Sequence, residues 1–196
     1  RSGHGMRFDI NGHDNTAQIT KLGGNGSTEI FDVAAAMEAD GLSLAGTDSD
    51  DVFNVTITDR SWVMLRGGRG DDTFAIGPSW GTVRLDYRYD NAGDAPNSGI
   101  VANLSEGVVS NDGFGGTDTI ATSVAALGAP GTIEPYGPVT IELRGTALSD
   151  RMIGSDSDER FIGLGGTDTI DGAGGWDLLR FDQSGIDGPV HVDLGE

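Results

Sequence analysis

The chain has 196 residues, with 31 acidic and 12 basic side chains and a formal net charge of −19. This charge excludes nucleic acids and anionic membrane surfaces as partners, because both require a basic surface and Lys21 is the only lysine. The chain has no cysteine, which excludes disulfides and thiolate metal sites. Cations, neutral substrates and other proteins remain as partners, and crowded carboxylates need something that neutralises them.

The first clear pattern along the chain is a nine-residue unit that combines glycine, aspartate and an apolar residue. Residues 46–54 (GTDSDDVFN) and 67–75 (GGRGDDTFA) both follow it, with aspartate at the sixth position and phenylalanine at the eighth. A degenerate copy at 23–31 (GGNGSTEIF) has threonine in place of the aspartate, so we expect that turn to be free of metal. Asp51 and Asp72 are 21 residues apart, and this spacing predicts a bulge or loop.

The segments between these units favour β-structure. Short alternating or β-branched stretches predict strands at 52–57, 83–85 and 139–143, with glycine-rich turns between them. Two short pieces, 33–39 and 123–127, have a composition that allows helix, and each would cap or bridge neighbouring strands. No stretch approaches the roughly 18 apolar residues of a membrane span. We therefore predict an all-β chain without membrane insertion.

The nine-residue unit returns at 113–121 (GFGGTDTIA) and then as four consecutive copies over 145–180. The eighth position is apolar in each copy, which predicts a row of buried side chains on short strands. Two units would complete one coil, so that turns on the same side are 18 residues apart. The pairs predicted by this spacing are Asp150 with Asp168 and Glu159 with Asp177.

Similar repeat units occur before and after residue 80. Residues 1–80 carry degenerate and strong units, and residues 81–196 carry the run of four. We expect these two parts to form one continuous solenoid that is a fragment of a longer protein. Stretches rich in proline and glycine at 90–98 and 128–138 predict surface insertions.

The repeated units supply the atoms that a hard divalent cation needs. Calcium takes six to eight oxygen ligands in a flexible geometry. Glycine turns present carbonyl oxygens that no side chain blocks, and each aspartate at the sixth position adds a carboxylate. A cation between stacked turns would therefore neutralise several charges at once.

The pattern GGxGxDxUx, where U is apolar, resembles the calcium-binding repeat of RTX (hemolysin-type) proteins. Residues 67–75 match it at every fixed position, and the units that begin at residues 113, 163 and 172 lack only the second glycine. The resemblance implies a right-handed parallel β-roll or β-helix with Ca²⁺ between its turns. It also implies type I secretion, a secreted or cell-surface location, and folding on calcium binding after export.

The predicted metal ligands are carboxylates and glycines of these units. Glu159 is longer than aspartate, so its site is either held differently or empty. The copy at 145–153 lacks the later glycines, and we expect it to cap the stack. For the acidic residues at 48, 50, 156 and 158, metal ligation and a solvated turn remain equal alternatives. The predicted ligands are Asp51, Gly67, Gly68, Gly70, Asp72, Gly113, Gly115, Gly116, Asp118, Asp150, Gly154, Asp156, Glu159, Gly163, Gly165, Gly166, Asp168, Gly172, Gly174, Gly175 and Asp177.

The chain has no HExxH zinc motif and no GxSxG nucleophile elbow, so we expect any catalysis to lie elsewhere in the parent protein. The main alternative is a β-helix segment that binds or modifies polysaccharide in a secreted enzyme. For that function a sugar-stacking platform would be formed by aromatic residues, whereas in the other interpretation these residues pack at coil edges. They are Trp62, Trp80, Trp176, Tyr87, Tyr89 and Tyr136. Another surface protein is a further candidate partner. The irregular units argue against a flat adhesive or ice-binding surface.

Overall fold

The computed structural model consists of strands and turns. All regular elements in the described part of the chain are strands, which confirms the predicted all-β class. No helix in this part could cross a membrane. The pieces considered for helix and the stretch 128–138 lie outside the described residues, as does most of the degenerate turn at 23–28. The structure describes residues 4–11, 16–21, 28–32, 41–57, 62–77, 81–89, 93–122 and 140–182, with only the backbone of 16–21 and 28–32.

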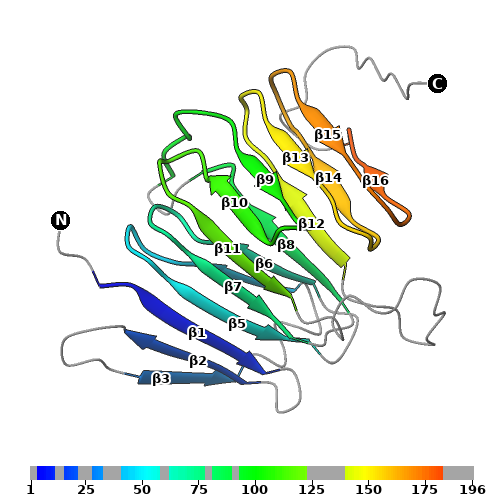
Figure 1. Cartoon of the computed structure of the whole chain (residues 1–196). Helices are drawn as coiled ribbons and strands as arrows, with labels where there is room; N and C mark the ends of the chain where they lie inside the picture. Colours follow the sequence, from blue (N-terminus) through cyan, green and yellow to red (C-terminus); the bar gives the residue numbers. More distant parts are fainter. Residues whose placement is uncertain are drawn as a thin grey trace.

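The strands form two sheets, which we call sheet A and sheet B (Figure 1). In spatial order, sheet A contains β15 (Thr169–Asp171), β13 (Arg151–Ile153), β9 (Val101–Asn103), β10 (Val108–Asn111), β11 (Asp118–Thr122), β7 (Thr73–Ile76), β5 (Val52–Thr56), β1 (Met6–Asn11), β2 (Thr16–Lys21) and β3 (Thr28–Asp32). Sheet B contains β16 (Leu178–Leu179), β14 (Arg160–Ile162), β12 (Thr140–Arg144), β8 (Thr82–Asp86), β6 (Trp62–Arg66) and β4 (Leu42–Ala45).

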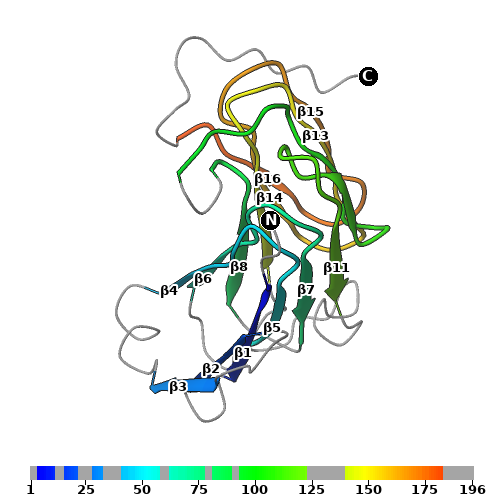
Figure 2. The same cartoon turned by 90° about the vertical axis from the view of Figure 1, so that its left-hand side faces the viewer.

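From β4 onward the chain passes repeatedly from one sheet to the other, and most neighbouring strands within a sheet are parallel. Figure 2 shows the two sheets facing each other, with β4, β6 and β8 opposite β5, β7 and β11. Each nine-residue unit of the run from 145 onward is a six-residue turn followed by a short strand, of three residues in β13, β14 and β15 and of two in β16. The six-residue turns that change sheets are 46–51, 67–72, 145–150, 154–159, 163–168 and 172–177.

The apolar residues at the eighth position align between the sheets as a buried row. In sheet A, Phe53 pairs in register with Phe74, and Met152 pairs with Ile170. The rings of Phe53 and Phe74 are stacked with centroids 5.1 Å apart, and both side chains are fully buried. Alternate residues of each strand point into this core, which is the two-residue period expected for strands. The predicted apolar row is therefore confirmed where the structure describes it.

The regular alternation is interrupted by an antiparallel hairpin in sheet A. Strands β8 and β12 are direct neighbours in sheet B, but β9, β10 and β11 all lie between β13 and β7 in sheet A. Strand β10 is antiparallel to both β9 and β11. The unit at 113–121 was predicted to turn between parallel strands, and this expectation was wrong. The reason is local, because the Asp112 carboxylate accepts three N–H groups of the following residues and closes a hairpin turn.

Strands from both sides of residue 80 share the two sheets. In sheet B, β6 pairs with β8, and in sheet A, β7 pairs with β11. At the other end of sheet A, β1 pairs in parallel with β5, and β2 and β3 extend the sheet in antiparallel fashion. The described elements before and after residue 80 therefore lie in a common pair of sheets.

Candidate metal centre

The six-residue turns are of two kinds, which differ in their second residue. In the glycine turns (67–72, 163–168 and 172–177), the second and fourth residues have positive φ. These include two residues that are not glycine, Leu164 at φ 74° and Ala173 at φ 65°. The left-handed conformation costs such residues roughly 1–2 kcal/mol, so the surrounding stack must stabilise it.

In the hydroxyl turns (46–51, 145–150 and 154–159), the second residue is threonine or serine. Its hydroxyl donates a hydrogen bond to the carboxylate at the sixth position of the same turn. The Thr146 Oγ1–Asp150 Oδ1 distance is 2.9 Å, and Ser155 Oγ donates to Glu159 in the same way. The backbone N–H of the same residue donates to the second carboxylate oxygen, at 2.8 Å for Thr146. These side chains satisfy carboxylate oxygens that a metal would otherwise bind.

The first residue of these turns must be glycine, because the carboxylate of the sixth residue occupies the space that a side chain would need. The Asp72 side chain folds back over Gly67, so that a Cβ atom at Gly67 would overlap Asp72 Oδ2. The same overlap would occur between Gly163 and Asp168. The five-residue separation of glycine and aspartate in the repeat therefore has a steric cause, whatever the turn binds.

The carboxylates of successive turns form ladders through the backbone. The carboxylate of each glycine turn accepts a hydrogen bond from the N–H of the residue at the same position one coil earlier. The N–H of Asp150 donates to Asp168 Oδ1 at 3.0 Å, and that of Glu159 donates to Asp177 Oδ1 at 3.0 Å. The two predicted pairs are therefore neighbours in stacked turns, at opposite edges of the sheets.

Asp51 and Asp72 stack in the same way although they are 21 residues apart. The N–H of Asp51 donates to Asp72 Oδ1 at 2.9 Å, and both turns have six residues. The additional length lies in the strands, because β5 and β6 have five residues each where β13 and β14 have three. Longer strands therefore contribute to the wider spacing. Residues 58–61, which connect β5 to β6, lie outside the described residues, so the predicted bulge or loop stays a prediction.

Five carboxylates at these turns are buried without a basic partner, whereas Asp168 and Asp177 are half-buried. Asp51, Asp72, Asp118, Asp150 and Glu159 are at most 3% exposed, and none of them forms an ion pair with a described residue. The buried arginines pair instead with two acids of sheet B. The pairs include Arg66, Arg88 and Arg144 with Asp86, and Arg84 and Arg180 with Glu142.

This burial disfavours the charged form of the carboxylates. Burial, with the nearby Asp118 charge as the next contribution, raises the pKa of Asp72 to about 9. Burial also raises the pKa of Asp118 to about 7 and that of Asp150 to about 6. For Asp51, Glu159 and Asp168, burial raises the pKa above its ordinary value. The folded turns therefore favour a proton or a cation at these oxygens.

The donor set of the glycine turns fits a hard cation. The Asp72 Oδ2 atom is buried and has no hydrogen-bond partner. Carbonyl oxygens of Gly67, Gly163 and Gly172 lie against the first glycine of the preceding turn. No group of three acidic or histidine side chains in the described ranges converges on a common metal position. A calcium site here would therefore depend on backbone carbonyls and water as well as carboxylates.

The remaining predicted ligands lie in several different kinds of turn. Gly113 and Gly115 have positive φ but belong to the hairpin turn, and Gly116 lies against the Gly70 carbonyl. Asp156 is exposed in a hydroxyl turn, near Gly174 of the next coil. The other glycines of the predicted set lie in their turns as expected from the repeat, namely Gly68, Gly70, Gly154, Gly165, Gly166, Gly172 and Gly175.

Sequence reasoning missed three kinds of residue at these turns. The hydroxyl donors had a visible signal, because Thr47, Thr146 and Ser155 each follow the first glycine of a unit that lacks the later ones. Tyr87, whose hydroxyl donates to Asp118 Oδ2 at 2.9 Å, and Asp112 had none. Both lie outside the nine-residue pattern. Asp112 closes the hairpin turn that directly follows it, whereas only the folding of distant segments brings Tyr87 to Asp118.

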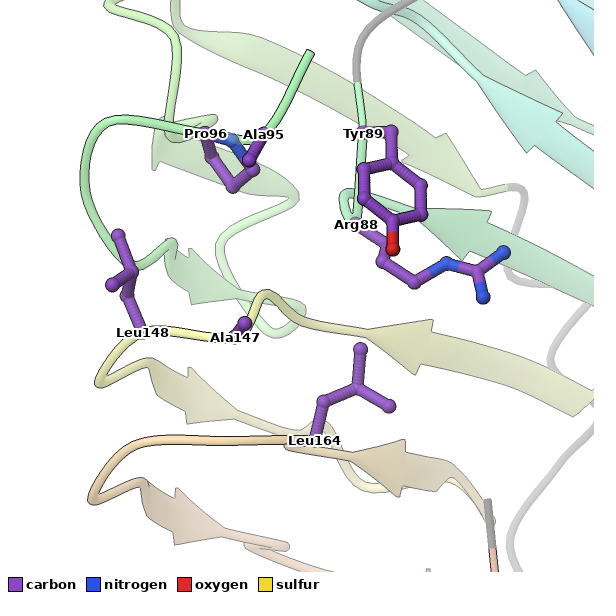
Figure 3. A pocket seen from close by; sticks show the side chains of 7 residues that line it. All are labelled: Arg88, Tyr89, Ala95, Pro96, Ala147, Leu148 and Leu164. Atoms are coloured by element: carbon purple, nitrogen blue, oxygen red, sulfur yellow. The ribbon is translucent and has the colours of Figure 1, made fainter. Parts of the chain in front are cut away.

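A separate pocket of about 260 Å³ lies beside the glycine turn 163–168 (Figure 3). Its wall is mostly apolar and includes Leu148, Leu164 and Pro96, with Arg88 and Tyr89 on one side. Within the described ranges, the candidate aromatic side chains lie in different surroundings. Trp62 lies under the Arg84 guanidinium, whereas Trp176 is 70% exposed in a turn. Trp80 lies outside the described residues. This arrangement gives sugar stacking no specific support.

Comparison with known proteins gives no match for this chain among family models, curated proteins or solved structures.

Proposed function

We propose that the chain is a calcium-binding module of the RTX type, folded as a right-handed parallel β-roll in a secreted or cell-surface protein. The observation that carries this proposal is the ladder of buried and half-buried carboxylates in stacked turns with no basic partner among the described residues. The passage of the chain between two sheets through six-residue GxxGxD turns also supports it.

Calcium is the cation that these turns favour. Their oxygens come from aspartates and backbone carbonyls at irregular positions, and calcium accepts such flexible sets of six to eight ligands. Magnesium requires near-ideal octahedral geometry and releases its water reluctantly. The carboxylates would lose their mutual repulsion on binding, and each metal would join two coils.

The two kinds of turn would have different roles. In the hydroxyl turns, the side chain of Thr47, Thr146 or Ser155 already donates to the carboxylate. Each hydroxyl turn stacks on a glycine turn that follows it in the sheet. We expect the hydroxyl turns to act as caps and the glycine turns to hold the metals. Asp72, Asp168 and Asp177 are then the main carboxylate ligands.

We propose secretion of the chain because of its resemblance to RTX proteins. A chain with this many unneutralised carboxylates would fold poorly at low calcium and fold after export, where calcium is abundant, because binding to the native state stabilises it by mass action. Any enzymatic activity is proposed to belong to other parts of the parent protein.

Isothermal titration calorimetry of the purified chain with calcium, and separately with magnesium, tests this function. We expect calcium to bind with dissociation constants of about 10⁻⁴–10⁻³ M, the range of extracellular modules, and magnesium to bind much more weakly. Absence of calcium binding at millimolar concentration would refute the proposal, and equal binding of the two ions would refute the assignment to calcium.

A further inference from the structure

The hairpin turn 112–117 lies directly against the glycine turn 67–72, and we call the boundary between these two turns the seam. Strand β11, which follows the hairpin turn, pairs with β7, which follows the glycine turn. The N–H of Thr117 donates to Asp71 Oδ1 at 2.8 Å, and the N–H of Asp72 donates to Asp118 Oδ1 at 3.0 Å. The seam is therefore the place where the inserted hairpin joins the parallel stack.

Asp112 presents an unused carboxylate oxygen at the seam. Its Oδ1 atom accepts hydrogen bonds from the N–H groups of Phe114, Gly115 and Gly116, at 2.7, 2.8 and 2.8 Å. The side chain is 0% exposed, and its Oδ2 atom has no hydrogen-bond partner. A buried carboxylate oxygen without a partner is costly, since it has lost water and gained nothing in return.

Two other oxygens at the seam are available to a ligand. A Cβ atom at Gly116 would overlap the Gly70 carbonyl oxygen and would lie 2.8 Å from Asp112 Oδ2, so both oxygens border the same small space. The Oδ2 atom of Asp72 is also buried without a partner. Asp118 differs, because both of its oxygens accept hydrogen bonds, from Asp72 N–H and from the Tyr87 hydroxyl.

We infer that the seam binds one divalent cation through Asp112 Oδ2, with the Gly70 carbonyl and Asp72 Oδ2 as further candidate ligands. This inference rests on the proposed calcium function, but Asp112 lies outside the nine-residue repeat and adds a site that the repeat does not predict. The carboxylate and carbonyl ligands are hard oxygens, which suit calcium. The bound cation fastens the antiparallel hairpin to the parallel stack.

The variant Asp112→Asn tests the site. Asparagine keeps one oxygen for the three N–H groups and replaces the free oxygen with an NH2 group, which is a hydrogen-bond donor and cannot bind a cation. We expect calorimetry to find one calcium ion fewer per chain than in the wild type, with binding to the other sites retained. The matched control is Glu106→Gln, which removes the same charge from an exposed residue of the β9–β10 turn and should leave the number of ions unchanged.

The outcomes separate this inference from the proposed function. If the wild type binds no calcium, the proposed function fails. If the wild type binds calcium and Asp112→Asn binds the same number of ions with the same affinity, the seam site is refuted and the proposed function stands. A measurement on the wild type alone guards against a misfolded variant: anomalous diffraction from terbium-loaded crystals should give a peak beside Asp112. Peaks at the glycine turns without one at the seam would overturn the inference.

Discussion

The substitution Gly67→Ala is expected to destabilise the folded chain by about 3 kcal/mol in saturating calcium, because the added methyl group overlaps the buried Asp72 carboxylate. The carboxylate cannot move aside easily, since its other oxygen accepts the N–H of Asp51 in the neighbouring coil. Urea unfolding followed by tryptophan fluorescence measures this change in the free energy of unfolding. If glycine and aspartate recur for this steric reason, the effect should be large even though the substitution removes no ligand side chain.

The control for this prediction is Gly93→Ala. Gly93 has φ of 86°, but a Cβ atom there would meet no other atom within 4 Å. Alanine at this position suffers only the cost of the left-handed backbone, which is about 1–2 kcal/mol. Equal losses for the two variants would show that backbone conformation, and not contact with the carboxylate, explains the first glycine.

In a chelator, the stability of the folded chain is expected to rise as the pH falls from 9 to 5. The folded-state pKa values of Asp72, at about 9, and Asp118, at about 7, lie above those of the unfolded chain. The folded state therefore binds protons more tightly, so this contribution to stability is fully present below about pH 4 and is lost as pH rises through 7 to 9. Asp118 alone should contribute roughly 3 kcal/mol between pH 9 and pH 5, and Asp72 should add to it. Because the chelated chain is expected to be coil at neutral pH, the gain should be seen as β-structure that forms in chelator when the pH is lowered, followed by far-UV circular dichroism.

Saturating calcium should remove most of this pH dependence above pH 6, because the metal then neutralises the carboxylates that a proton neutralises in its absence. The stabilisation by calcium should accordingly be larger at pH 8 than at pH 5. A metal-free protein that becomes steadily less stable as the pH is lowered from 9 to 5 would contradict the burial of unpaired carboxylates.

Local features of the sequence were sufficient to predict the repeated part of the fold. An apolar residue two positions after each aspartate lies on a short strand and points into the core, as Met152 and Ile170 do. The 18-residue spacing correctly paired Asp150 with Asp168, because each coil of this run uses two identical units of turn and strand. These features depend on residues close together in the sequence.

The features that the sequence did not reveal depend on contacts between distant segments. The unit at 113–121 has the same glycines and aspartate as its relatives, yet it forms a hairpin because Asp112 precedes it and β10 can pair backwards with β9. No pattern within nine residues encodes that pairing. The burial of Asp112 and Tyr87 likewise arises only when the hairpin packs on the 67–72 turn.

The most direct test of calcium-driven folding is far-UV circular dichroism of the chelated chain during titration with calcium and, separately, with magnesium. The proposal predicts a transition from coil to β-structure with calcium at near-millimolar concentration, and little change with magnesium at the same concentration. A spectrum that is already fully β in excess chelator, with a melting temperature that calcium does not alter, would contradict it.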